Sequence, residues 1–202
     1  MDARSPFVIN THELARQPGA MRTVEREVSA PEGFGTAVMG VVPDSAMRLD
    51  LRLESVMEGV LVSGEATVDV KGECARCLRD VAGTETVPVS ELYFYPGARA
   101  AALAEGDEEA EDMQELEGEL LDLEPTLRDA IVTAMPFQPL CDAACRGLCP
   151  GCGERLDDLP ADHAHEDLDP RWAALAELAA ALEPDDAGEP SDAEDPSRTE
   201  DR

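Results

Sequence analysis

The stretch MRLDLRLES, residues 47–55, decides the fold class of this chain. Leucine stands at positions 49, 51 and 53 and charged residues stand between them, which is the period of two expected for a half-buried β-strand. Further short apolar runs follow at 60–62, 66–70, 87–89 and 92–95. Short connections favour antiparallel pairing, so residues 47–95 are predicted to form a β-meander of about four strands, with Gly64 in a turn.

A helix is predicted over residues 122–135, downstream of the meander. Pro125 suits a first helical turn, and Leu127 and Ile131 recur four residues apart, as on one face of a helix. Pro136 cannot continue the helix and ends it. The chain then enters the cysteine-rich segment, so the position of this helix on the sheet determines where the cysteines lie.

A second helix is predicted over residues 169–182. Asp169 can cap it, Pro170 fits its first turn, and apolar residues form one stripe: Trp172, Leu175, Leu178 or Ala179, and Leu182. The fold class is therefore predicted as α+β, an antiparallel β-meander sheet packed by two helices, with a C-terminal cysteine-rich zinc-knuckle segment at 139–156. Residues 1–182 are predicted to form a single domain.

The charge is strongly negative. The 202 residues include 16 basic and 45 acidic ones, a formal net charge of −29. Residues 98–119 are predicted to form an acidic loop and 183–202 a disordered acidic tail, because neither has enough large apolar residues to offset the entropy of ordering. An acidic surface repels phosphate backbones and attracts basic partners. Aromatic residues make up only 3%, which argues against a stacking platform for single-stranded nucleic acid.

The N-terminal residues contain no apolar run typical of a secretory signal, and no segment is long and apolar enough to span a membrane. A cytoplasmic protein without membrane contact is therefore expected. Thiols stay reduced in the cytoplasm, so the six cysteines are interpreted as metal ligands, redox groups or core residues before disulfides.

Four of the cysteines, Cys141, Cys145, Cys149 and Cys152, lie within twelve residues, and Cys74 and Cys77 form an upstream C-x2-C pair. Zinc in a structural site takes four ligands, and the glycines and proline of CPGCG favour a tight turn that presents two sulfurs to one ion. We predict one structural zinc per chain. The preferred ligands are the four C-terminal cysteines; the alternative is a split site in which Cys74 and Cys77 pair with Cys149 and Cys152.

Other interpretations of these residues stay open. Cys74 and Cys77 could fill a strand end, or act in redox chemistry, although no helix follows that would lower a thiol pKa. His163 and His165 could supply nitrogen ligands, although histidines in an acidic loop are more often solvated. No phosphate-binding loop, G-x-S-x-G motif or recognisable pair of carboxylates is present, so no enzymatic activity is predicted.

The chain resembles the YceD family of bacterial and plastid proteins. The matching motifs are CARCL at 74–78, LDLEPTLRDAIVTAMPFQPLC at 121–141, CRGLCPGCG at 145–153 and LDPRWAAL at 168–175. The resemblance covers about residues 5–182. It implies a non-enzymatic ribosome biogenesis factor that supports accumulation of large-subunit (23S) ribosomal RNA.

The resemblance implies a large-subunit ribosomal protein or a pre-ribosomal particle as the partner. A basic ribosomal protein suits the acidic chain best; the other option is contact with ribosomal RNA through a local basic patch, for which the candidates are Arg76, Arg79, Arg146 and Arg155. The alternative function is that of a stand-alone zinc-ribbon regulator that binds nucleic acid.

Overall fold

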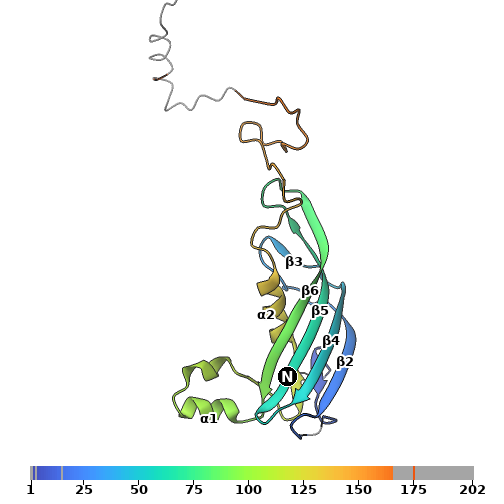
Figure 1. The fold of residues 1–202 in the computed structure, drawn as a ribbon, viewed down its shortest axis with the longest axis vertical. Coiled ribbons are helices and arrows are strands. Elements are labelled where there is room, and N and C mark those ends of the chain that lie inside the picture. Colours follow the sequence, from blue (N-terminus) through green and yellow to red (C-terminus); the bar gives the residue numbers. More distant parts are fainter. Residues whose placement is uncertain (1, 3, 15, 166–174, 176–202) are drawn as a thin grey trace, which may run out of the picture. The chain divides into compact units, whose positions relative to one another are not determined.

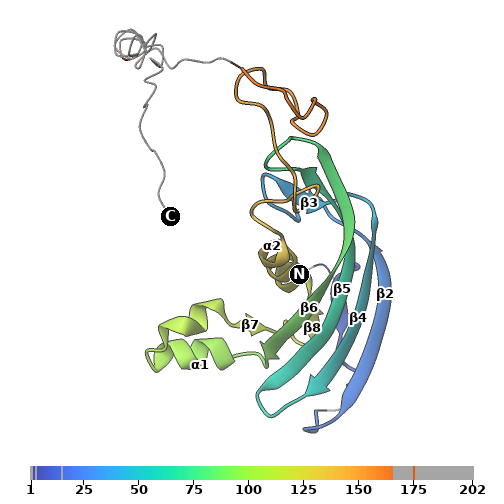
Figure 2. The same ribbon diagram turned by 45° about the horizontal axis from the view of Figure 1, so that its top comes forward.

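A computed structural model describes residues 2, 4–14, 16–165 and 175. The chain divides into two compact units, Met1–Leu159 and Pro160–Arg202. The first unit contains a strongly curved sheet, and helix α2 (Glu124–Ala134) lies on its concave side (Figures 1 and 2). The described part of the second unit contains a turn in which the amide of His163 donates to the carbonyl of Pro160. No helix among the described residues is long and apolar enough to cross a membrane.

The main sheet has six strands, in the order β2-β4-β5-β6-β7 with β3 also paired to β5. Neighbouring strands are antiparallel except for β7, which runs parallel to β6. The strands are β2 (Met21–Ser29), β3 (Met39–Val41), β4 (Ala46–Ser55), β5 (Gly59–Glu73), β6 (Asp80–Phe94) and β7 (Gln114–Glu115).

The alternating stretch that predicts the fold lies in β4, and its leucines Leu49, Leu51 and Leu53 are buried on the face toward α2. The structure has three long strands where the sequence predicts about four, because Gly64 continues β5 instead of making a turn. Gly64 has φ +151°, and a Cβ there would lie 2.8 Å from the Cα of Leu51. Glycine therefore allows β4 and β5 to approach closely at this point.

The region before residue 46 adds strands that the alternation did not predict. Besides β2 and β3, the strand β1 (Val8–Asn10) pairs antiparallel with β8 (Leu120–Asp122) in a small second sheet. In this second sheet, the side chains of Ile9 and Leu121 are completely buried and belong to the same hydrophobic core as the leucines of β4. Arg26 joins the two sheets, since its Nη1 donates to the carbonyls of Pro6 at 3.0 Å and Val8 at 3.2 Å.

Residues 98–119 differ from the predicted acidic loop. They contain α1 (Ala98–Ala104), the short 3-10 helix η1 (Glu108–Asp112) and β7. Two apolar side chains of this segment, Ala110 and Leu116, are buried and attach it to the rest of the protein. Asp107 caps η1 by accepting a hydrogen bond from the amide of Glu109 at 3.1 Å. Composition alone did not reveal these anchors, because acidic residues surround both of them.

Helix α2 agrees with the prediction for 122–135. Leu127 and Ile131 are buried, and the chain becomes extended at Met135, just before Pro136. Tyr93 of β6 fixes the start of the helix: its hydroxyl donates to the carbonyl of Asp122 at 2.8 Å and lies 2.6 Å from the hydroxyl of Thr126. Apart from residue 175, the helix predicted at 169–182 lies outside the described residues, and so does the acidic tail at 183–202.

Candidate metal centre

The turn between β5 and β6 carries the C-x2-C pair. Its backbone is closed by two hydrogen bonds, from the amide of Cys74 to the carbonyl of Arg79 at 2.8 Å and from the amide of Leu78 to the carbonyl of Cys74 at 2.9 Å. Leu78 adopts a left-handed conformation with φ +55°. The tight turn directs both sulfurs into the protein, where Cys74 and Cys77 are 0% and 1% exposed.

The chain that follows α2 passes directly over this turn. The amide of Ala75 donates to the carbonyl of Pro139 at 2.8 Å, and Arg76 Nη1 donates to the carbonyl of Cys145 at 2.9 Å. Gly147 has φ +84°, and a Cβ there would lie 3.2 Å from the carbonyl oxygen of Arg76. These contacts bring Cys141 and Cys145, which follow α2, next to Cys74 and Cys77.

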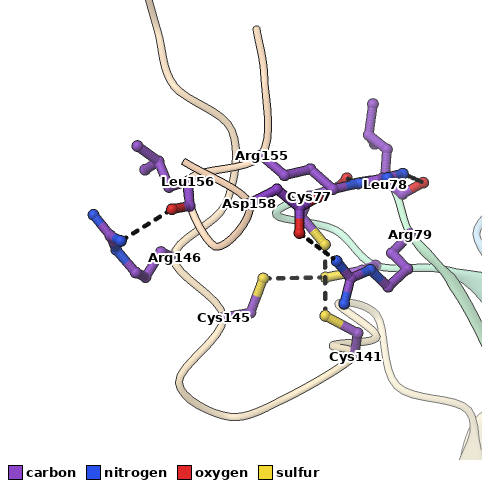
Figure 3. A network of polar contacts seen from close by, with 10 residues as sticks. Cys77, Leu78, Arg79, Cys141, Cys145, Arg146, Arg155, Leu156 and Asp158 are labelled. Atoms are coloured by element: carbon purple, nitrogen blue, oxygen red, sulfur yellow. Dashed lines mark hydrogen bonds and ion pairs between the residues drawn. The ribbon is translucent and has the colours of Figure 1, made fainter. Parts of the chain in front are cut away.

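Four sulfurs converge at this place: the Sγ atoms of Cys74, Cys77, Cys141 and Cys145 all lie within 4.8 Å of one another. The Sγ atoms of Cys74 and Cys145 are 3.8 Å apart, and those of Cys77 and Cys141 are 3.5 Å apart (Figure 3). Sulfurs at about 2.3 Å from a tetrahedral zinc are separated by about 3.8 Å. The donor set and its spacing therefore fit a four-thiolate metal site.

The pKa values of these thiols are spread apart. The backbone amide of Cys141 lowers the pKa of Cys74 to about 6, and the amides of Arg76 and Cys77 add to this effect. The Cys77 thiol, followed by burial, raises the pKa of Cys141 to about 12, and burial raises the pKa of Cys145. The backbone thus stabilises a thiolate at Cys74, and a cation among the sulfurs would stabilise thiolates at Cys141 and Cys145.

This group of sulfurs corresponds to neither of the predicted ligand sets. The structure places Cys141 and Cys145 with Cys74 and Cys77, whereas the sequence suggested either the four C-terminal cysteines or Cys74 and Cys77 with the last two. The reason is the path of the chain after α2, which brings the first two cysteines of the C-terminal cluster, and not the last two, against the β5–β6 turn.

Cys149 and Cys152 lie outside this group, in the turn predicted from CPGCG. The amide of Cys149 donates to the carbonyl of Glu154 at 2.7 Å, and the amide of Gly153 donates back to the carbonyl of Cys149 at 2.8 Å. Cys149 is buried and Cys152 is exposed. In the second unit, the rings of His163 and His165 meet edge to face with centroids 4.6 Å apart.

All four arginines of the predicted basic patch hold the cysteine loops in place. Arg155 Nε donates to the carbonyl of Cys77 at 2.9 Å, and Arg146 Nη1 donates to the carbonyl of Leu156 at 3.0 Å (Figure 3). Arg79 pairs with Asp158 at 3.3 Å, and Arg76 binds the carbonyl of Cys145 as described. Each guanidinium keeps further donors, but its orientation is set by contacts within the protein.

The arrangement suits a structural metal centre. Cys74, Cys77 and Cys145 are buried and Cys141 is half-buried, and four sulfurs leave a tetrahedral ion no open coordination position for a substrate. The ligands come from two segments, and Cys77 and Cys141 are 64 positions apart in the sequence. An ion bound to them would join the tip of the β5–β6 hairpin to the loop that follows α2.

Comparison with known proteins places the chain in a family. Residues 62–179 match the family described as large ribosomal RNA subunit accumulation protein YceD, a range that includes all four clustered sulfurs. The uncharacterized protein Rv2926c of Mycobacterium tuberculosis is 40% identical over 174 residues, which cover 86% of this chain and 82% of that protein.

Other relatives are more distant. The uncharacterized protein ML1660 of Mycobacterium leprae is 34% identical over 89% of this chain and 81% of its own length, and the uncharacterized protein YlbN of Bacillus subtilis is 26% identical over 69% and 73%. No solved structure matches the chain significantly. With a family match over more than half of its residues, and relatives that align along most of their length, the chain belongs to the YceD family.

Proposed function

We propose that this protein is a non-enzymatic, cytoplasmic factor in biogenesis of the large ribosomal subunit, and that it supports accumulation of 23S ribosomal RNA. The observation that carries the proposal is membership of the YceD family, whose description names accumulation of the large ribosomal RNA subunit. The protein would act by binding, because its cysteine centre is suited to hold a fold together and offers a substrate no free position.

The metal in the proposed function is a structural zinc ion bound by Cys74, Cys77, Cys141 and Cys145. Two features support zinc: the ligand set consists only of sulfur, and the separations of the sulfurs match a small tetrahedral ion. Backbone amides that face Cys74 are the kind of second shell that stabilises a thiolate ligand. The role of the ion would be to fix the loop after α2 on the β5–β6 turn.

The partner that we propose is a basic protein of the large subunit or of a pre-ribosomal particle. A net charge of −29 favours association with strongly basic proteins and opposes non-specific binding of RNA. The arginines proposed for an RNA contact are already bonded within the protein, and Asp158 accompanies Arg79. These features favour protein over RNA as the first contact.

Depletion of the protein in its own cells tests the proposal. We expect the ratio of 23S to 16S ribosomal RNA to fall and large-subunit precursors to accumulate in sucrose gradients, with recovery when the intact gene is restored. An unchanged ratio with a normal subunit profile would refute the proposed function. Tight, steeply salt-dependent binding to duplex DNA would favour the alternative, a nucleic-acid-binding regulator.

A further inference from the structure

A groove runs beside the outer edge of β6, between that strand, α2 and the segment around β7. It consists of two neighbouring cavities of about 500 and 610 Å³. Both are lined by Asp112, Gln114 and Asp129, so they form one continuous depression. Figure 2 shows the surrounding elements, with β7 beside the end of β6 and α2 on the concave side of the sheet.

The outer edge of β6 is largely without a strand partner. On its inner edge β5 pairs with every residue from Asp80 to Phe94, whereas on its outer edge β7 pairs only with Tyr93 and Phe94. Within the described part of the chain, no other strand pairs with that edge. Pro88 lies in this strand, and a proline without an amide hydrogen is tolerated at an unpaired edge.

The short strand β7 shows where an added segment would lie. It occupies the outer edge of β6 at Tyr93 and Phe94, and the edge continues past it toward residue 80. An unpaired edge offers backbone hydrogen-bonding groups to an extended chain, which is the basis of strand addition. The part of β6 that lines the groove, Val87–Glu91, would accommodate about five residues in extended form, or roughly 17 Å.

The groove is acidic. The first cavity has a single basic lining residue, Arg99, and six acidic ones: Glu111, Asp112, Glu115, Glu117, Asp122 and Asp129. The second adds Glu91 and has no basic residue. No ion pair that the described residues form includes Glu91, Asp112 or Asp129. Burial raises the pKa of Glu91, and the carboxylate of Asp129 raises it further, so a cation placed here would relieve an unfavourable field.

We infer that this groove binds an extended segment rich in lysine and arginine from a partner protein, laid along β6 in line with β7. The inference rests on the proposed function for the class of partner, a basic protein, and adds the surface that receives it. The walls offer mostly acceptors, namely carboxylates and outward carbonyls of β6, and Pro88 removes one donor from the edge. Lysine and arginine are donors only, so such a segment complements the groove in both charge and hydrogen bonding.

The test uses the full-length protein and a fluorescein-labelled dodecapeptide of alternating lysine and threonine. Fluorescence anisotropy at several salt concentrations measures the dissociation constant. In the groove variant, Glu91→Gln, Asp112→Asn and Asp129→Asn remove three carboxylates while keeping the side-chain shapes. We expect binding to weaken about tenfold, because three ion pairs are lost, one of them with the half-buried Glu91, and we expect its salt dependence to flatten.

The matched control removes the same charge from the other side of the sheet. Glu25 and Glu27 on β2 and Asp50 on β4 are exposed and lie at least two strands away from β6, so Glu25→Gln, Glu27→Gln and Asp50→Asn form a triple variant of equal net charge. We expect this control to bind the peptide within about twofold of the unaltered protein, since distant exposed charges are screened beyond about 8 Å. Equal weakening in both variants would overturn the inference.

A second peptide tests the placement along β6. N-methylation of alternate residues removes backbone donors without changing charge, so it should weaken binding to the unaltered protein. If methylation has no effect, strand addition is refuted. Binding of a single-stranded RNA in the groove would also overturn the inference. So would a change of oligomeric state in the groove variant when the unaltered protein does not bind the peptide. If the peptide does not bind but depletion still lowers the amount of 23S RNA, the groove is not the binding site for a basic segment, while the proposed function stands.

Discussion

Replacement of a single clustered cysteine distinguishes the observed sulfur group from the ligand sets suggested by the sequence. In the structure, Cys145 belongs to the four-sulfur group and Cys152 does not, although both belong to the C-terminal cysteine cluster. We therefore compare Cys145→Ser with Cys152→Ser. The two substitutions are chemically identical, so any difference between them reports the position of the residue.

The expected magnitude follows from the division of the zinc-binding free energy among four sulfurs. If the binding free energy of a structural zinc site is shared evenly, loss of one thiolate weakens binding on the order of 100-fold or more. Cys145→Ser should therefore raise the zinc dissociation constant of the tightest site by that factor. Cys152→Ser should leave that site nearly unchanged, because its side chain is exposed and lies outside the group.

The assay is competition between the reduced protein and a chromophoric zinc chelator, with metal content checked by elemental analysis. Cobalt substitution provides a second readout, since the intensity of sulfur-to-cobalt charge transfer follows the number of thiolates. Hydrogen exchange at the amides of Cys74 and Leu78 should increase in Cys145→Ser, because the ion no longer holds the β5–β6 turn. The opposite order, with tight binding lost in Cys152→Ser and kept in Cys145→Ser, would refute the observed grouping.

Three further predictions test other parts of the structure. Gly64→Ala should destabilise the protein by on the order of 3 kcal/mol in urea unfolding, because a Cβ meets the backbone of β4, whereas Gly83→Ala has open space and should be nearly neutral; equal effects would contradict this account. Tyr93→Phe should cost about 1–3 kcal/mol, because it removes the buried hydroxyl that joins β6 to the start of α2; an unchanged unfolding midpoint would argue against that link. In the metal-free protein, absorbance at 240 nm should show one thiolate with a midpoint near pH 6 that disappears in Cys74→Ser. Folding lowers the pKa of Cys74 from 9.0, so its thiolate stabilises the metal-free protein fully above pH 9. This contribution to stability is lost as the pH falls through 6. A first thiolate that appears only above pH 8 would refute the lowered pKa of Cys74.

The elements that the sequence predicts well have strong local signals. The leucine alternation of β4 and the spacing of Leu127 and Ile131 in α2 each report one buried face, and the structure confirms both. Strand β2 lies at the edge of the sheet with only Val24 buried, so it lacks that alternation and was not predicted. The elements of the acidic segment 98–119 were not predicted for the same reason, because only two of its apolar side chains, Ala110 and Leu116, are buried.

The choice of sulfur partners could not be predicted in the same way. Cysteine content and turn residues indicate a metal site, but which pairs meet depends on the length of the β5–β6 hairpin and on where α2 ends. Both are non-local properties: β5 and β6 have 15 residues each, and Cys74 meets Cys145 across 71 residues of sequence. The groove beside β6 is likewise a product of topology, since its carboxylates come from strand, 3-10 helix and α2.

The separation of the ligands along the chain sets an order of events during synthesis. The hairpin that carries Cys74 and Cys77 is complete once Phe94 has emerged from the translating ribosome, but the second pair of sulfurs follows only with Cys141 and Cys145. During that interval, the first two thiols stand at the tip of a nascent hairpin without their later partners. They are then most open to oxidation or to capture of a different metal, and the arrival of the loop after α2 closes this period of vulnerability.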